Sequence, residues 1–116
     1  MKKYLFTFVG GNPTLKFSNL AQVPHEARAA HLKEWSEWMA GLANAGQLES
    51  GYPLESAGKN VNSAGVADHD FSKDGAGGFI ILKANSLDEA AKIASTSPII
   101  KNGGKVYVQP CGEMKP

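Results

Sequence analysis

Two segments of this chain are apolar on both sides of an extended strand. Phe79–Leu82 contains four apolar residues in succession, and Lys2–Val9 (KKYLFTFV) carries large apolar residues at both odd and even positions. Successive side chains of a strand point to opposite faces, so a strand with one solvated face alternates apolar and polar residues. Both faces of the predicted sheet therefore need a cover, because apolar areas of that size are rarely left in water.

A long amphipathic helix is predicted to supply one cover. Pro24 suits the first turn of a helix and Gly46 is a typical stop, so the helix should span about 24–45. At helical spacing its apolar side consists of His31, Trp35, Trp38, Met39 and Leu42. This stripe predicts that the helix packs against the sheet.

The rest of the chain alternates between strand and turn signals. Gly51 and Pro53 indicate an edge or a bulge in a second strand. Ser86 to Glu89 form a capping box that begins a second helix, and Pro98 should end it. We therefore expect strands at 48–54, within 60–70, at 79–84 and at 105–110, with a loop at 71–77.

The predicted order, β-α-β-β-(β)-α-β, is that of the ferredoxin-like fold, an α+β class in which two helices cover one face of an antiparallel sheet. Two helices leave the second face bare, and residues 55–77 are too polar to serve as its lid. We therefore expect a homodimer in which two sheets pack face to face as a dimeric α/β barrel.

Composition narrows the class of protein. The 116 residues suit one domain, here 1–116, and 42% hydrophobic with 20% charged residues is typical of globular chains. No apolar run is long enough to span a membrane, and a net charge of +1 without a basic stripe argues against a nucleic-acid partner. The single cysteine, Cys111, fits a cytoplasmic protein.

The glycine-rich stretch 75–78 lacks the Lys-Ser/Thr ending of a phosphate loop, so we expect no cofactor.

Several short motifs occur in a fairly specific order and spacing. Residues 31–46 read H-x3-W-x2-W-M-x2-L-x3-G, residues 51–54 read G-x-P-L, and Asp74 and Gly75 precede G-G-F. Residues 86–110 contain S-L-D-E-A, S-P, G-G and V-x-V-x-P. In these motifs the chain resembles the YCII-related family, also called the DGPF domain, over nearly its whole length.

The resemblance implies a ferredoxin-like fold, a dimeric α/β barrel, and a cleft beside the first helix or between the subunits. It also implies a small enzyme that uses a His-Asp pair, and a relative acts in chloroaromatic breakdown. His31 matches the family's helix histidine, and Asp74 matches the aspartate of the DGPF motif. The chain departs from the family pattern because the Pro and Phe of that motif are missing and the segment before G-G-F is shortened.

His31 is the candidate catalytic group. Its position in the apolar stripe directs the imidazole into the protein or a cleft, where it could act as general acid or base near neutral pH. Such a ring needs an acceptor to orient it, for which Asp74 comes first and Asp68 or Asp70 second. The competing interpretation is a structural histidine that is hydrogen-bonded within the core.

A small-molecule pocket is predicted around this histidine. Trp35, on the same helix stripe, and Tyr52 and Pro53, at the irregular strand, are its expected substrate-binding residues. Two alternatives remain open. One is a non-catalytic ligand-binding or protein-interaction module, and the other is an RNA-recognition-like module, which shares the element order.

A metal site is the weakest of the predictions considered. Asp68, His69 and Asp70 could be ligands together with His25 or His31, but they show no recognised metal spacing. We therefore expect a solvated turn at 68–70 and no metal.

Overall fold

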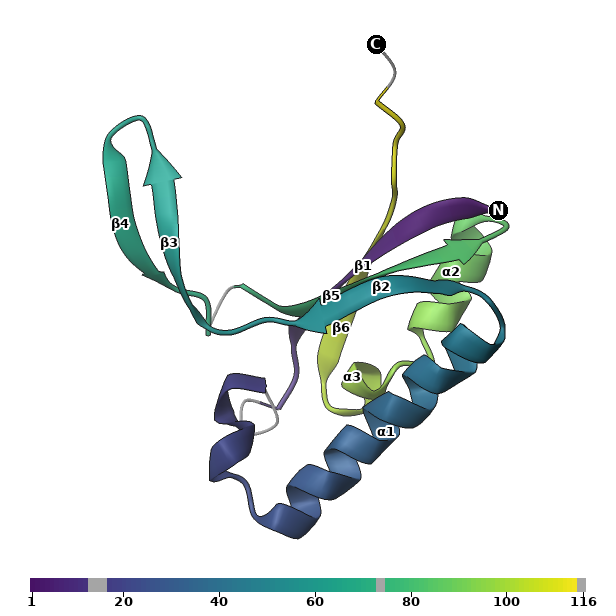
Figure 1. The fold of residues 1–116 in the computed structure, drawn as a ribbon, viewed down its shortest axis with the longest axis horizontal. Helices are drawn as coiled ribbons and strands as arrows, with labels where there is room; N and C mark the ends of the chain where they lie inside the picture. Colours follow the sequence, from purple (N-terminus) through teal and green to yellow (C-terminus); the bar gives the residue numbers. More distant parts are fainter. Residues whose placement is uncertain (13–16, 73–74, 115–116) are drawn as a thin grey trace.

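The computed structural model describes residues 1–12, 17–72 and 75–114. Its main sheet has four antiparallel strands in the order β2-β5-β1-β6. These strands are β1 (Lys2–Gly10), β2 (Leu48–Pro53), β5 (Ala76–Ala84) and β6 (Gly104–Pro110). Helices α1 (His25–Asn44), α2 (Leu87–Ala94) and α3 (Pro98–Lys101) lie on one side of the sheet, as Figure 1 shows. This arrangement confirms the predicted ferredoxin-like α+β fold.

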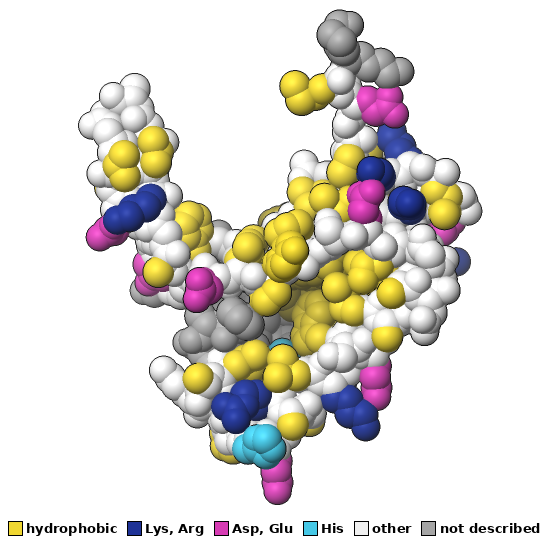
Figure 2. All heavy atoms as spheres, viewed as in Figure 1, with side chains coloured by type: hydrophobic (Ala, Val, Ile, Leu, Met, Phe, Trp, Pro, Cys, Tyr) yellow, Lys and Arg dark blue, Asp and Glu magenta, His cyan; other side chains and the backbone are white. Residues whose placement is uncertain are grey.

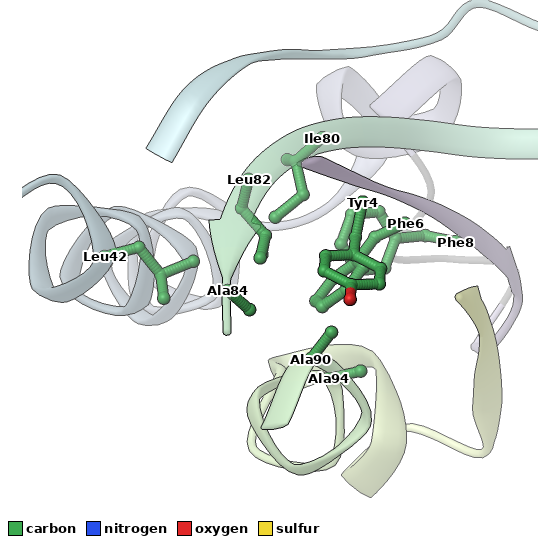
Figure 3. Packing of buried hydrophobic residues seen from close by; sticks show 9 residues of the cluster. All are labelled: Tyr4, Phe6, Phe8, Leu42, Ile80, Leu82, Ala84, Ala90 and Ala94. Atoms are coloured by element: carbon green, nitrogen blue, oxygen red, sulfur yellow. The ribbon is translucent and has the colours of Figure 1, made fainter. Parts of the chain in front are cut away.

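The hydrophobic core lies between the sheet and these helices. In the two central strands, one set of alternating side chains is almost completely buried: Tyr4, Phe6, Phe8, Ile80, Leu82 and Ala84. In Figure 3, Ala90 and Ala94 of α2 face the aromatic rings of β1. Because alanine has no long side chain, α2 can approach the large rings closely, and the core reaches the density that protein interiors require.

Local signals at the helix ends act as the sequence predicts. Pro24 immediately precedes α1, and Gly46 follows it with a φ of 72°, a left-handed conformation that glycine adopts without strain. At the start of α2, the backbone amide of Glu89 donates to the hydroxyl oxygen of Ser86 at 3.1 Å. The carboxylate of Glu89 accepts from the side-chain amide of Gln47 at 3.3 Å, which links α2 to the start of β2.

Residues 57–70 differ from the prediction of a single strand within 60–70. They form a separate two-stranded hairpin, β3 (Ala57–Asn62) with β4 (Gly65–Asp70), which extends away from the main sheet in Figure 1. Gly65 has a φ of 128°, which closes the tight turn. The hairpin lacks apolar alternation because neither of its faces packs on the core, and this explains why the sequence pattern did not reveal two strands.

A second correction concerns the region after α2. Pro98 was expected to end a helix and lead into a turn, but it begins the short helix α3. Proline is tolerated at the first helical position because its missing N–H has no partner there in any case. A short 3-10 helix, η2 (Phe17–Gln22), precedes α1. No helix in the described ranges is long and apolar enough to cross a membrane.

The second face of the sheet is also apolar, and it lies away from the three helices. We call it the open face. Leu5, Thr7, Val9, Phe79 and Ile81 on this face are half-buried. Tyr52 and Tyr107, on flanking strands in register with Phe79 and Thr7, are 68% and 51% exposed. The expectation that a second copy covers the open face therefore stays a prediction.

Candidate functional site

A pocket of about 380 Å³ lies between α1 and the sheet. Figure 2 shows hydrophobic side chains gathered in the hollow between these elements. The α1 residues that line the pocket are His31, Leu32, Trp35, Ser36 and Met39. The strands contribute residues around Phe8, Tyr52, Pro53, Gly78 and Phe79. The volume is typical of sites that enclose a small organic molecule.

His31 lies one helical turn before Trp35 and lines this pocket. It is half-buried, and its ring centroid lies 6.4 Å from that of Trp35, with the two ring planes at 73°. Helical spacing explains the arrangement, because residues four apart occupy the same face of an α-helix. The imidazole therefore stands at a mainly apolar wall, where a ligand can meet it with little competition from water.

Two aromatic residues, Phe8 and Trp35, line the pocket, and Trp38 packs against both of their rings. Phe8 of β1 contacts Trp35 edge-to-face at 5.0 Å and Trp38 at 6.1 Å between centroids. The two tryptophan rings are perpendicular to one another at 5.8 Å. Trp38 is held in place by a hydrogen bond from its indole N–H to the hydroxyl of Thr96 at 2.9 Å. Edge-to-face packing fixes these rings, so the wall is preformed.

The other side of the pocket is formed where β2 meets β5. Tyr52 and Phe79 are in register, so their rings, with centroids 6.2 Å apart, lie on the open face, and the two residues bound the pocket at the edge of the sheet. Gly51 allows the strands to approach closely here, because a Cβ atom at this position would lie 2.5 Å from the side chain of Ile80. Tyr52 and Pro53 thus line both the pocket and the edge of the sheet.

The site is almost uncharged. Among the described residues that line the pocket, none is Lys, Arg, Asp or Glu, and the polar residues are Asn12, His31, Ser36 and Asn102. Multiply charged ligands such as phosphates depend on paired cations or a helix N-terminus. The pocket is better matched to a neutral, largely apolar ligand with one or two polar groups.

Two of the three predicted carboxylate partners of His31 can be placed in the structure. Asp74 lies outside the described residues. Asp68 forms an ion pair with Lys59 across the β3–β4 hairpin, and Asp70 accepts a hydrogen bond from the amide of Ser72 at 2.9 Å. Neither Asp68 nor Asp70 lines the pocket, so both lower-ranked candidates are separated from it.

The residues once considered as metal ligands have other neighbours. The ring of His69 packs against Phe71 at 4.3 Å between centroids. His25 stands at the exposed start of α1, where Arg28 contacts its ring nitrogen at 3.4 Å. Across the described parts of the chain, no three His, Cys, Asp or Glu side chains gather as metal ligands would.

Sequence reasoning missed part of the pocket wall. Leu20 of η2, Ile99 of α3 and Asn102 after α3 all line it. These residues lie in or next to short helices that have no periodic pattern, and α3 was not predicted from the sequence. The one available signal was Pro98, which marks a helix start as readily as a helix end.

Comparison with known proteins places these observations in context. Residues 14–111 match the family model described as the YCII-related domain. At the level of sequence, no protein of curated function matches the chain. Among solved structures, the fold is similar to 5-chloro-2-hydroxyhydroquinone dehydrochlorinase from Burkholderia phenoliruptrix AC1100, determined in complex with 2,5-dihydroxybenzoquinone. The TM-score is 0.58 at 19% identity, over 97% of this chain and 95% of that one.

Proposed function

Because this chain belongs to the YCII-related domain family, we propose that it is a small enzyme that binds a compact aromatic ligand in the pocket beside α1. The observation that carries the proposal is the position of His31, which opens onto a mainly apolar pocket of about 380 Å³ walled by Phe8 and Trp35. Flat aromatic walls suit a flat ligand, and among the described residues that line the pocket His31 alone has a side chain of the type that exchanges protons near neutral pH.

The charge of the site supports a phenol or hydroquinone as the ligand class. A phenol is neutral at pH 7, so it enters an uncharged apolar pocket without the cost of burying an ion. A ring hydroxyl also offers a proton that a neighbouring base can accept, which increases the electron density of the ring. The similar structure was solved with 2,5-dihydroxybenzoquinone, which like a phenol is a compact six-membered ring with hydroxyl substituents.

In this proposal His31 is the general acid or base, and Asp74 orients its ring. Trp35, Tyr52 and Pro53 hold the ligand at the walls and the outer edge of the pocket. Support for Asp74 comes from its match to the family motif alone. A non-catalytic binding module is the second candidate, and the observation in its favour is that no described carboxylate lines the pocket.

We also propose that the protein is a homodimer whose two open faces pack together. The support is the apolar character of this face, where Leu5, Phe79 and Ile81 remain half-buried and Tyr52 is exposed. Burial of such a face is favourable by about 25 cal/mol per Å² of apolar surface. Since Tyr52 belongs to both the open face and the pocket, the second subunit would lie next to the ligand.

The proposal is tested by titrating the protein with hydroquinone and with phenol, by absorbance and by calorimetry. We expect binding by the wild type with a pH dependence within the range in which imidazoles titrate, about pH 5 to 8. The variant His31→Ala should bind about tenfold more weakly and lose that pH dependence, because the hydrogen-bonding and titrating group is gone.

His25→Ala is the matched control, because His25 also lies on α1 but is exposed and outside the pocket. It should bind as the wild type does. Asp74→Asn should weaken the pH dependence less than His31→Ala does. Equal affinity and an equal pH profile in wild type and His31→Ala would contradict the role of His31. Binding without turnover of the ligand in the wild type and in every variant would favour the non-catalytic module.

A further inference from the structure

Ile99 forms one end of the pocket, in contact with the backbone at two glycines. At that end the lining residues are Gly10 and Gly11 at the end of β1, Ile99 of α3, and Asn102. A Cβ atom at Gly104 would lie 2.4 Å from Cγ1 of Ile99, and one at Gly11 would lie 3.4 Å from the same atom. The side chain of Ile99 therefore occupies a niche that exists because positions 11 and 104 carry no side chain.

The niche leaves the side chain of Ile99 no room to move away from the pocket. Gly104 lies in β6, which is hydrogen-bonded to β1, so the backbone at this position is held by the sheet. Isoleucine is branched at Cβ and has few allowed rotamers. A ligand group that approaches this end meets a stiff side chain backed by main chain, and protein interiors at normal packing density yield little.

The helix that carries Ile99 is itself anchored. Lys101 forms an ion pair with Glu34 of α1 at 2.8 Å. The buried hydroxyl of Ser97, just before α3, donates to the carbonyl of Ala94 at 2.7 Å. The amide of Asn102 donates to the carbonyl of Ile99 at 3.2 Å. Since α3 is tied to both longer helices, Ile99 is a rigid end wall.

We propose that Ile99, seated against Gly11 and Gly104, is the residue that limits the size of the ligand. The inference rests on the proposed function, because it assumes that an aromatic ligand occupies this pocket. The inference narrows the ligand class to aromatic rings that carry no bulky alkyl group on the edge facing Ile99. A hydrophobic wall discriminates by about tenfold or more for each added carbon group that it excludes.

The test is calorimetric titration with phenol, 4-methylphenol, 4-isopropylphenol and 4-tert-butylphenol. Wild-type affinity should fall as the substituent grows. In Ile99→Ala the order should reverse, with 4-tert-butylphenol gaining about tenfold relative to phenol, because the end of the pocket is opened. Ile100→Ala is the matched control, since Ile100 is the next residue of α3 but is 43% exposed and lies outside the pocket. It should keep the wild-type order.

The glycine niche is tested separately with Gly104→Ala. The added methyl displaces Ile99 toward the pocket, so this variant should bind every phenol more weakly than the wild type. In the double variant Ile99→Ala with Gly104→Ala the added methyl no longer meets Ile99, although it still lies 3.0 Å from the backbone nitrogen of Gly11, so the affinities should rise from those of Gly104→Ala toward those of Ile99→Ala. If Gly104→Ala does not fold, a more stable double variant that binds the phenols supports the same contact, and a double variant that is no better than Gly104→Ala contradicts it.

The outcomes separate this inference from the proposed function. Binding of the series with the same order of affinities in wild type and Ile99→Ala overturns the role of Ile99 and leaves the proposed function standing. Absence of binding to every phenol in both proteins overturns the two together.

Discussion

The two faces of the main sheet are built from the same strands and are both apolar, yet they differ in what lies against them. Phe6 and Leu82, on the helix side, are 0% exposed. Their sequence neighbours Leu5 and Ile81, on the open face, are half-buried. Alternation of side chains along a strand places these neighbours on opposite faces. The contrast shows that residue type alone does not decide whether a side chain is buried. Burial also depends on which elements pack against that face of the sheet.

The comparison also explains why a pocket forms on the helix side. Large rings on β1 meet small residues on α2 at one end of the sheet, where the core is closed. At the other end α1 carries Trp35 and Met39 alongside Phe8, and glycines occupy the adjoining positions of β1, β2 and β5. Bulky helix residues opposite glycines keep the layers apart and leave space for a ligand.

The largest expected effect contrasts Phe6→Ala with Leu5→Ala. Loss of the fully buried ring should lower the free energy of unfolding by about 3–5 kcal/mol, because it leaves a cavity. Loss of the Leu5 side chain should cost about 1 kcal/mol in a monomer, since less apolar area is removed from a half-buried position. Urea unfolding followed by circular dichroism measures both. Equal losses would show that the two faces are equally covered.

An intermediate effect is expected for Ile81→Glu on the open face. A carboxylate at the centre of the proposed dimer interface should raise the dissociation constant of the dimer by about a hundredfold or more, because an unpaired buried charge is strongly disfavoured. Sedimentation equilibrium gives the mass of wild type and variant. A wild type that is monomeric at micromolar concentration would refute the dimer, and a monomeric variant with an unchanged circular dichroism spectrum would support it.

The smallest effect is expected at the rim of the open face. Lys3 forms an ion pair with Glu49 at 2.7 Å, and the hydrogen bond and charge of Glu49 raise the pKa of Lys3 above its usual 10.5. A raised lysine pKa adds stability below pH 10.5, and this is lost as the pH rises through the folded-state value. Glu49→Gln should therefore lower the midpoint of thermal unfolding slightly at pH 7. At a pH well above the raised pKa of Lys3 the substitution should leave the midpoint unchanged. A shift of equal size at both pH values would show that the charge is not its cause.

The fold was predictable where local chemistry and tertiary packing agree. Pro24 and Gly46 bound α1, Ser86 begins α2, and the apolar strands define the centre of the sheet. The β3–β4 hairpin and α3 were not predicted, because neither carries a periodic apolar pattern. A short element that packs little, or that is four residues long, leaves no such signal in the sequence.

The candidate site was predictable to a similar degree. His31, Trp35, Tyr52 and Pro53 were selected from the sequence, and all four line one pocket. Helical spacing accounts for the first two, and strand irregularity at Gly51 for the others. Ile99 could not have been found in this way, because its role depends on contact with glycines distant in the sequence, which periodicity does not report.

The attachment of the β3–β4 hairpin has a structural consequence. The amide of Leu54 donates to the carbonyl of Gly77 at 3.0 Å, and the amide of Phe71 donates to that of Ser56 at 2.7 Å. The excursion between β2 and β5 thus leaves and re-enters the sheet at neighbouring points, with its own ladder of hydrogen bonds. Such a surface segment tolerates changes of length and sequence that leave the packing of the main sheet as it is.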